Sequence, residues 1–292
     1  MKANANGIEL EYDIHGDEDA PPLLLIMGLS AQMTLWREEF VAELVDRGFR
    51  VIRFDNRDIG LSTFFDEAGV PDMANALATG QLPPAVYSLD DMADDAAGLL
   101  DALGIEAAHI VGASMGGMIA QTFAIRHPEK TISLCSIMST TGNPGVGQAD
   151  PALIGQMFMA PPPTTAEEAE EAGLLATKVI GSPGYPADEA QVRAYARAAF
   201  ERSNHPEGIA RQMLAIVHQA DRTDALAKVE VPTLVIHGDA DPLVTPSGGE
   251  ATAAAVPGAE LWMQAGVGHD LPPALYSETA DRIAANCRRA AT

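Results

Sequence analysis

Short apolar segments alternate with amphipathic helical segments between residues 23 and 138 of this chain. We interpret residues 23–28, 50–55, 109–112 and 131–138 as strands. Three segments have a helical pattern: the stripe of Phe40, Leu44 and Val45, residues 89–103, which Gly104 ends, and residues 118–124. Successive parallel strands need a crossover between them, and the crossover helices cover both faces of the sheet. The alternation therefore predicts an α/β fold with a mostly parallel sheet, to which residues 8–14 add an antiparallel strand.

The alternation stops between residues 141 and 224. Residues 141–163 are rich in Gly, Pro and Asn, and three helical patterns follow: one that Thr165 and Glu168 begin with a capping box, one over 188–202 and one over 206–220. Strand patterns resume at 232–237 and 260–263. We therefore expect residues 1–140 and 225–292 to form an α/β core, and residues 141–224 to form a helical cap over the strand ends.

The motif Gly112-Ala113-Ser114-Met115-Gly116 follows a predicted strand and opens a predicted helix. This is the pattern of a nucleophile elbow, in which a serine occupies a tight strand-to-helix turn with a strained backbone. The residues two positions before and after the serine must lack side chains, or they would collide, and both are Gly here. The motif predicts that Ser114 is a nucleophile whose hydroxyl stands above the sheet.

A serine nucleophile needs a general base, and the base needs a group that orients it. Of the seven histidines, His269 lies in a loop after the last predicted strand, where its flanking glycines allow the imidazole to reach the edge of the sheet. His237 ends a predicted strand beside Gly238, and we interpret it as a turn residue. We therefore expect His269 to be the base.

The orienting acid should follow a strand between Ser114 and His269, a condition that Asp239 and Asp241 both meet. Asp241 stands deeper in its loop and precedes Pro242, which favours an extended approach, so we favour Asp241 as the orienting residue. We expect Asp239 to bond turn amides.

Two backbone N–H groups are expected to stabilise the oxyanion of an acyl-transfer intermediate. One belongs to Met115, the residue after the nucleophile. The other should come from the loop Met27-Gly28-Leu29-Ser30, where we favour the N–H of Leu29 over the hydroxyl of Ser30.

The chain resembles the α/β-hydrolase superfamily, and within it the serine esterases of the aclacinomycin methylesterase-like group. The segments that carry this resemblance are 27–32 with Trp36, 55–62, 112–117 and 238–241, together with the chain order Ser114, Asp241, His269. The resemblance implies an eight-stranded sheet, a helical cap between the sixth and seventh strands, and cleavage of carboxylic esters without a cofactor. Many relatives have His-Gly where this chain has Met27-Gly28, which leaves the amide donors in place but alters the wall of the pocket.

The segment from Asp55 to Ser62 contains two aspartates three residues apart, but no further cluster of ligands completes a metal site, so we expect no metal. We expect Arg57 and Asp58 to lock the loop near the elbow and Asp55 to be structural. The glutamates at positions 167, 168, 170 and 171 are typical of a solvated helix face.

Methionines are common in the segments that should line the pocket, and flexible thioethers suit an adaptable apolar cavity. The substrate-binding residues we expect are Met27, Met138, Met157 and Phe158. Because no Arg or Lys near the motifs suggests a clamp for an anionic group, we predict a small-molecule substrate, a neutral, hydrophobic ester of short to medium acyl chain.

The same triad supports other reactions, namely lactone hydrolysis, C–C bond hydrolysis, and acyl transfer to an alcohol or a peroxide. A non-catalytic ligand-binding receptor is a further alternative on this fold, although an intact set of Ser114, Asp241 and His269 argues against it.

The formal net charge of −23 disfavours binding to nucleic acids or to anionic membrane surfaces, because both need a basic protein surface. No stretch approaches the roughly 20 apolar residues of a membrane span, and no signal peptide is visible, so we expect a cytoplasmic protein. The two cysteines, Cys135 and Cys287, indicate neither a disulfide framework nor a zinc site.

Overall fold

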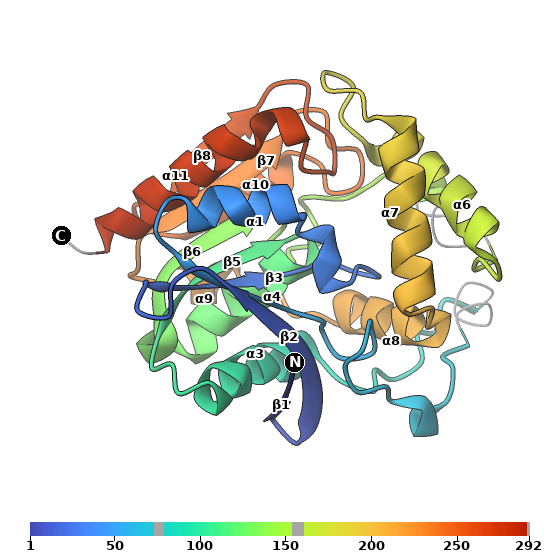
Figure 1. The fold of residues 1–292 in the computed structure, drawn as a ribbon, viewed down its shortest axis with the longest axis horizontal. Coiled ribbons are helices and arrows are strands. Elements are labelled where there is room, and N and C mark those ends of the chain that lie inside the picture. Colours follow the sequence, from blue (N-terminus) through green and yellow to red (C-terminus); the bar gives the residue numbers. More distant parts are fainter. Residues whose placement is uncertain (73–78, 154–160, 291–292) are drawn as a thin grey trace.

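The computed structural model describes residues 1–72, 79–153 and 161–290, which contain an eight-stranded sheet in the order β1-β2-β4-β3-β5-β6-β7-β8 (Figure 1). The strands are β1 (Lys2–Ala5), β2 (Ile8–His15), β3 (Pro22–Ile26), β4 (Arg50–Phe54), β5 (Ala108–Ala113), β6 (Thr131–Ile137), β7 (Thr233–Gly238) and β8 (Glu260–Gln264). β2 runs antiparallel to β1 and β4, and all pairs from β4 to β8 are parallel. The expected eight-stranded, mostly parallel sheet is confirmed.

Helices cover both faces of the sheet. α1 (Glu38–Val45) and α11 (Tyr276–Arg289) pack on one face, and α3 (Leu89–Ala102), α4 (Met115–Arg126), α9 (Thr223–Leu226) and α10 (Ser247–Ala255) pack on the other (Figure 1). Leu23 and Leu25 of β3 join the core under α1 and α11, whereas Leu24 and Ile26 join the core under α3 and α4. Side chains alternate across a strand, so a strand covered on both faces is apolar at every position.

Short 3-10 helices occur in the connections between these elements: η1 (Met33–Leu35), η2 (Asp66–Ala68), η3 (Pro128–Lys130) and η4 (Pro273–Leu275). The start of α3 carries a complete capping box, in which the Ser88 side chain accepts from the Asp91 N–H and the Asp91 carboxylate accepts from the Ser88 N–H.

The segment between β6 and β7 contains α6 (Ala166–Ile180), α7 (Glu189–Arg202) and α8 (Pro206–Val217), which lie together to one side of the sheet (Figure 1). We call α6, α7, α8 and their connections, from residue 161 to residue 217, the insertion. Thr165 caps α6 by accepting from the Glu168 N–H, but the Glu168 carboxylate bonds to Thr164 instead of closing the expected capping box.

Ion pairs join α6 to α7 across a glutamate face that stays mostly exposed, as expected: the side chains of Glu167 and Glu171 are 74% and 68% exposed, whereas that of Glu170 is 16% exposed. Arg193 pairs with Glu170 and Glu171, and Arg197 pairs with Glu167 and Glu170. The helical period placed these glutamates on one face, but it could not show that a second helix packs against that face.

Arg57 and Asp58 hold the loop after β4, as expected, but each does so through a partner on another element and not through its neighbour. Arg57 pairs with the buried Asp95 of α3, and Asp58 pairs with the buried Arg211 of α8. Burial would raise the pKa of Asp58, but hydrogen bonds from Arg211 and from the Phe65 N–H hold that pKa below its ordinary value. The loop after β4 is thus fastened to the core by one residue and to the insertion by the next.

Within the part of the chain that the structure describes, no helix combines the length and the apolar character needed to cross a membrane.

Candidate active site

Ser114 occupies a strained turn where β5 passes into α4. Its backbone has φ 58° and ψ −121°, in the region that residues with side chains rarely adopt. A Cβ atom on Gly112 would lie 2.0 Å from the carbonyl oxygen of Gly116, and a Cβ on Gly116 would lie 2.1 Å from that of Ile26. The turn is therefore closed so tightly that only glycine fits at either side of the serine, as the motif predicted.

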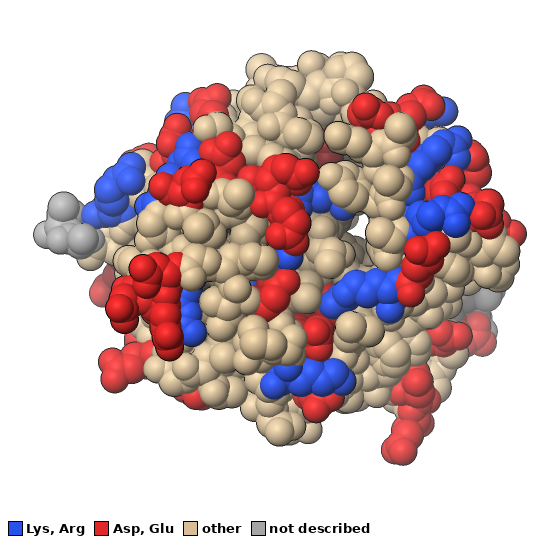
Figure 2. All heavy atoms as spheres, in the orientation of Figure 1, with Lys and Arg blue, Asp and Glu red and all other residues tan. Residues whose placement is uncertain are grey.

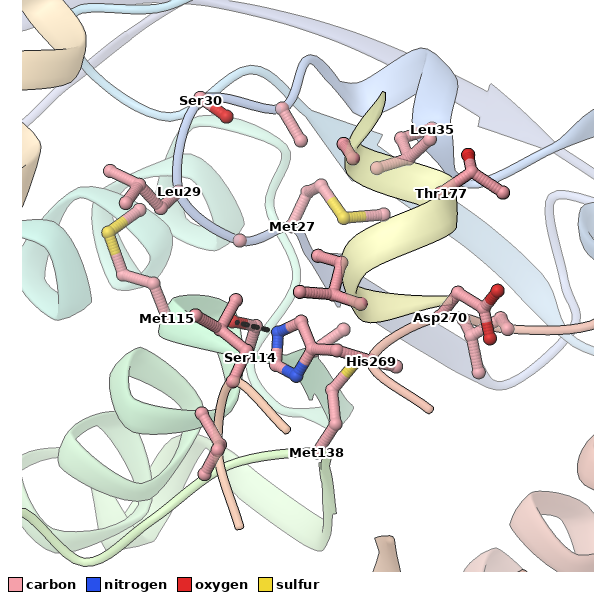
Figure 3. Close-up of a pocket in the computed structure, with 18 of the residues that line it drawn as sticks. Met27, Leu29, Ser30, Leu35, Ser114, Met115, Met138, Thr177, His269 and Asp270 are labelled. Carbon is pink, nitrogen blue, oxygen red and sulfur yellow. Dashed lines mark hydrogen bonds between the residues drawn. The ribbon is translucent and has the colours of Figure 1, made fainter. Parts of the chain in front are cut away.

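Three side chains that are far apart in the sequence form one hydrogen-bonded chain, of which Figure 3 shows the contact between Ser114 and His269. The Oγ of Ser114 lies 2.9 Å from Nε2 of His269, and Nδ1 of His269 lies 2.7 Å from Oδ2 of Asp241. Asp241 is 2% exposed, so its charge acts on the imidazole with little screening by water. This geometry permits the imidazole to take a proton from the serine while the carboxylate fixes its tautomer.

The two candidate aspartates make different hydrogen bonds in the structure. Oδ1 of Asp241 accepts from the N–H groups of Leu243 and Val244, each at 2.9 Å, which leaves Oδ2 for the imidazole. Asp239 accepts from the N–H of Gly266 at 2.7 Å. Asp241 is therefore placed to orient His269, whereas Asp239 bonds to the loop after β8 and not, as expected, to the amides of its own turn.

His237 lies closer to this chain than its interpretation as a turn residue suggested. It is 1% exposed, and its Nε2 lies 2.8 Å from the carbonyl oxygen of Val244 and 3.5 Å from Oδ2 of Asp241. Burial lowers its pKa, which favours the neutral ring, and the contact with a carbonyl places the proton on Nε2. The signal in the sequence was its position at the end of a strand, at the same sheet edge as Ser114.

Two amides expected to form an oxyanion hole lie at the same site. Among the described residues, no hydrogen bond uses the backbone N–H of Leu29 or of Met115. Gly28 approaches the serine so closely that a Cβ there would lie 3.0 Å from Cβ of Ser114. Figure 3 shows Leu29 and Met115 beside Ser114, with the side chain of Ser30 farther away.

A cavity of about 1420 Å³ opens above Ser114 between the sheet edge and the insertion. Met27 and Met138 line it, as predicted, and Figure 3 shows both near His269. The two other substrate-binding residues we expected, Met157 and Phe158, lie outside the described residues. Figure 2 shows the surface hollowed beside α7, on a face where acidic side chains are prominent.

Arg37 also lines this cavity, although the sequence suggested no cation there. Its guanidinium lies 3.2 Å from the ring centroid of Tyr195 on α7, and burial lowers its pKa. Among the described residues, no hydrogen bond or carboxylate partner is found for this guanidinium. The sequence offered one indication that Arg37 lies in the cavity, namely its position directly after Trp36 in the loop that follows β3.

Asp270, the neighbour of the candidate base, also lines the cavity and bonds to the side chain of Ser182. Burial raises its pKa. The described residues contain no group of three or more His, Cys, Asp or Glu side chains that could hold a metal ion.

Comparisons with known proteins place this geometry in context. A family model described as the alpha/beta hydrolase fold matches residues 21–272. Rhodomycin D methylesterase DauP of Streptomyces sp. (strain C5) is 31% identical over 294 residues, covering 94% of this chain and 93% of that protein. The 3-oxoadipate enol-lactonase 2 of Acinetobacter baylyi is 27% identical over 254 residues, covering 84% and 81%. The crystal structure of the enol-lactonase from Burkholderia xenovorans LB400 superposes with a TM-score of 0.73 at 25% identity, covering 100% of this chain and 99% of that one.

Proposed function

Because the chain belongs to the alpha/beta hydrolase fold family, as its motifs predicted, we propose that it is a serine carboxylesterase that works through Ser114, His269 and Asp241. The observation that carries this proposal is the continuous hydrogen-bonded chain from the serine hydroxyl through the imidazole to the buried carboxylate. Two methylesterase relatives, each 31% identical over 94% of this chain, support a carboxylic ester as the substrate.

Acylation begins when Nε2 of His269 takes the hydroxyl proton as Oγ of Ser114 attacks the ester carbonyl. The carbonyl oxygen becomes an oxyanion that accepts hydrogen bonds from the N–H groups of Leu29 and Met115. The tetrahedral intermediate then expels the alcohol, which receives the proton from the imidazolium, and an acyl-enzyme remains. Asp241 stabilises the imidazolium and holds its tautomer throughout.

Deacylation repeats these steps with water as the nucleophile. His269 takes a proton from water as the oxygen attacks the acyl-enzyme, and then returns that proton to Oγ of Ser114 as the acid leaves. The two half-reactions require the same two backbone amides and the same base, so one active site catalyses both.

We propose neutral, hydrophobic esters of short to medium acyl chain as substrates, with residues 141–224 acting as the cap that bounds the cavity. Met27, Met115 and Met138 give the wall near Ser114 an adaptable apolar character. The cavity of about 1420 Å³ is large enough for a ligand of more than one ring.

Lactone hydrolysis is the second candidate, because two of the similar proteins are enol-lactonases. A lactone is an ester whose leaving alcohol stays attached to the acyl group, so the same triad cleaves it without a change in mechanism. A further relative is a bifunctional esterase/perhydrolase, which makes acyl transfer to peroxide an outcome to test.

The test is a screen of p-nitrophenyl and alkyl esters, five- and six-membered lactones, and esters with added methanol or hydrogen peroxide as competing nucleophiles. Wild-type protein should cleave the esters, and a fluorophosphonate should label residue 114. Ser114→Ala should lower kcat by roughly 10⁴-fold or more while the protein stays folded by circular dichroism. Retained turnover in that variant would overturn the proposal, and ligand binding without any turnover would favour the receptor alternative.

A further inference from the structure

The loop Met27–Gln32, which we call the oxyanion loop, is fastened on both sides of the peptide that carries the Leu29 N–H. On the side before it, the carbonyl oxygen of Met27 accepts from Nδ2 of Asn56 at 2.8 Å. On the side after it, the N–H of Ser30 donates to Oε1 of Gln212 at 3.1 Å. Both flanking peptide planes are therefore held by a side chain, and the plane between them presents the candidate oxyanion donor.

The fastening on the Ser30 side comes from the insertion. Gln212 belongs to α8, is fully buried, and also donates from Nε2 to the carbonyl oxygen of Arg57 at 2.8 Å. These two contacts fix the orientation of its amide, because a flip would set a donor against the Ser30 N–H and an acceptor against the Arg57 carbonyl. Gln212 thus bridges two core loops from a helix that is not part of the core.

The oxyanion loop needs such a support. Ser30 has φ 63°, a backbone conformation that is unfavourable for any residue other than glycine. Contacts with the surrounding structure must offset this free-energy cost. Gly28 must lack a side chain because of its approach to Ser114, and glycine leaves the neighbouring peptide free to rotate. The Leu29 N–H lies in the peptide between Gly28 and Leu29, so without the contact to Ser30, rotation about ψ of Gly28 and φ of Leu29 would turn it away from the oxyanion.

A second attachment lies at the end of the same loop. Nε2 of Gln32 donates to the carbonyl oxygens of Ala199 and Ser203, at 2.7 and 2.9 Å, and Oε1 accepts from Arg202. The C-terminal end of α7 and the middle of α8 therefore hold the oxyanion loop together.

We propose that Gln212 is a positioning residue that keeps the Leu29 N–H aimed at the oxyanion, so that the insertion forms part of the catalytic apparatus as well as a wall of the cavity. This proposal rests on the esterase function proposed above. It predicts a selective loss of transition-state stabilisation when Gln212 is changed, because the oxyanion exists only after the serine has attacked.

The experiment compares Gln212→Met and Gln212→Glu with the wild type on p-nitrophenyl butyrate. Gln212→Met removes the acceptor for Ser30, and kcat should fall by roughly 10- to 100-fold while KM changes by less than about threefold. Gln212→Glu keeps an acceptor for the Ser30 N–H but sets a carboxyl oxygen against the Arg57 carbonyl oxygen, so it should recover only part of that loss. If Gln212→Met does not fold, Gln212→Asn, whose shorter side chain cannot span both partners, carries the same expectation.

Inhibitor binding separates a positioning role from a structural one. Oγ of Ser114 adds to the carbonyl of an alkyl trifluoromethyl ketone, and the carbonyl oxygen becomes an oxyanion. The matching methyl ketone binds without this addition. In Gln212→Met the inhibition constant of the fluorinated ketone should rise in proportion to the loss in kcat/KM, and that of the methyl ketone should stay constant.

The matched control is Leu214→Ala, which removes a fully buried side chain from the same helix and leaves in place the side-chain amide of Gln212 and its two partners. Its melting temperature should fall at least as far as that of Gln212→Met, with kcat within about threefold of the wild type. Equal losses of kcat in the two variants, or an unchanged kcat in a folded Gln212→Met, would overturn the positioning role while leaving the esterase intact. A wild type that neither cleaves esters nor reacts with a fluorophosphonate at Ser114 would overturn both proposals.

Discussion

The backbone N–H of His269 donates to the carbonyl oxygen of Ile180, the last residue of α6, at an N–O distance of 2.6 Å. The adjoining residues continue this contact: the N–H of Gly268 donates to Oγ of Ser182 at 2.9 Å, and the N–H of Gly184 donates to the Gly266 carbonyl at 2.8 Å. The insertion therefore holds the loop that carries the candidate base, just as α8 holds the oxyanion loop.

Ser182→Ala should loosen the loop of His269. The change removes the acceptor for the Gly268 N–H and the partner of Asp270, so we expect kcat to fall by roughly 3- to 10-fold through a less ordered imidazole. Turnover of p-nitrophenyl esters under saturating substrate measures this effect. Ser277→Ala, which removes a hydroxyl that bonds to Arg47 away from the cavity, is the control and should keep the wild-type kcat. The same kcat in both variants would count against the bracing role of Ser182.

Asp241→Asn should lower kcat by roughly 10³- to 10⁴-fold, because an amide cannot hold the proton-bearing tautomer of His269 that the mechanism needs. Asp239→Asn should change kcat by less than about tenfold, since the hydrogen bond found for the Asp239 side chain among the described residues is to the Gly266 N–H, which an Asn oxygen can still accept. Steady-state kinetics on one ester compares the two variants. The opposite ranking would show that the orienting carboxylate is Asp239.

Arg37→Met tests whether the substrate is neutral. The guanidinium, for which no carboxylate partner is found among the described residues, would partly offset the cost of bringing a carboxylate-ended acyl chain into this cavity. The kcat/KM values of the monomethyl and dimethyl esters of one dicarboxylic acid measure this preference. We expect the wild type to prefer the dimethyl ester, and Arg37→Met to reduce kcat/KM for the monomethyl ester by about tenfold relative to the dimethyl ester. A wild-type preference for the monomethyl ester would contradict the proposal of neutral substrates.

His109 should make the folded protein less stable in acid. It is 6% exposed, and burial lowers its pKa to about 4, against about 6.5 in an unfolded chain. Between these values the unfolded state binds the proton more tightly, so stability present above pH 6.5 is lost as the pH falls, up to roughly 3 kcal/mol by pH 4. Denaturant unfolding at pH 7 and pH 5 measures the loss.

The control for this effect is His109→Gln, which keeps a polar partner for Ser133 but cannot bind the proton. The difference in unfolding free energy between pH 7 and pH 5 should be smaller in this variant than in the wild type. Equal differences in the two proteins would show that His109 does not contribute.

Local pattern was enough to locate the elbow, because its geometry depends on residues within two positions of Ser114. It was also enough to select the central strands β3 to β7, since burial on both faces favours apolar residues along a whole segment, but it did not predict β1 (Lys2–Ala5). Short-range pattern failed for the partners of charged side chains. Arg57 and Asp58 are adjacent, yet they pair with Asp95 and Arg211, and the glutamates of α6 pair with arginines of α7.

The sequence by itself determined the α/β class, the order of Ser114, Asp241 and His269, and the expectation of an acyl-transfer site, because each follows from local residue types and from their order along the chain. Only the tertiary structure decided that Asp241 faces the imidazole, that Arg37 lines the cavity, and that Gln212 holds the oxyanion loop. These contacts join segments separated by up to 182 residues. Strand register and the packing of the insertion bring them together, and no periodicity within one segment encodes which distant side chain will lie opposite.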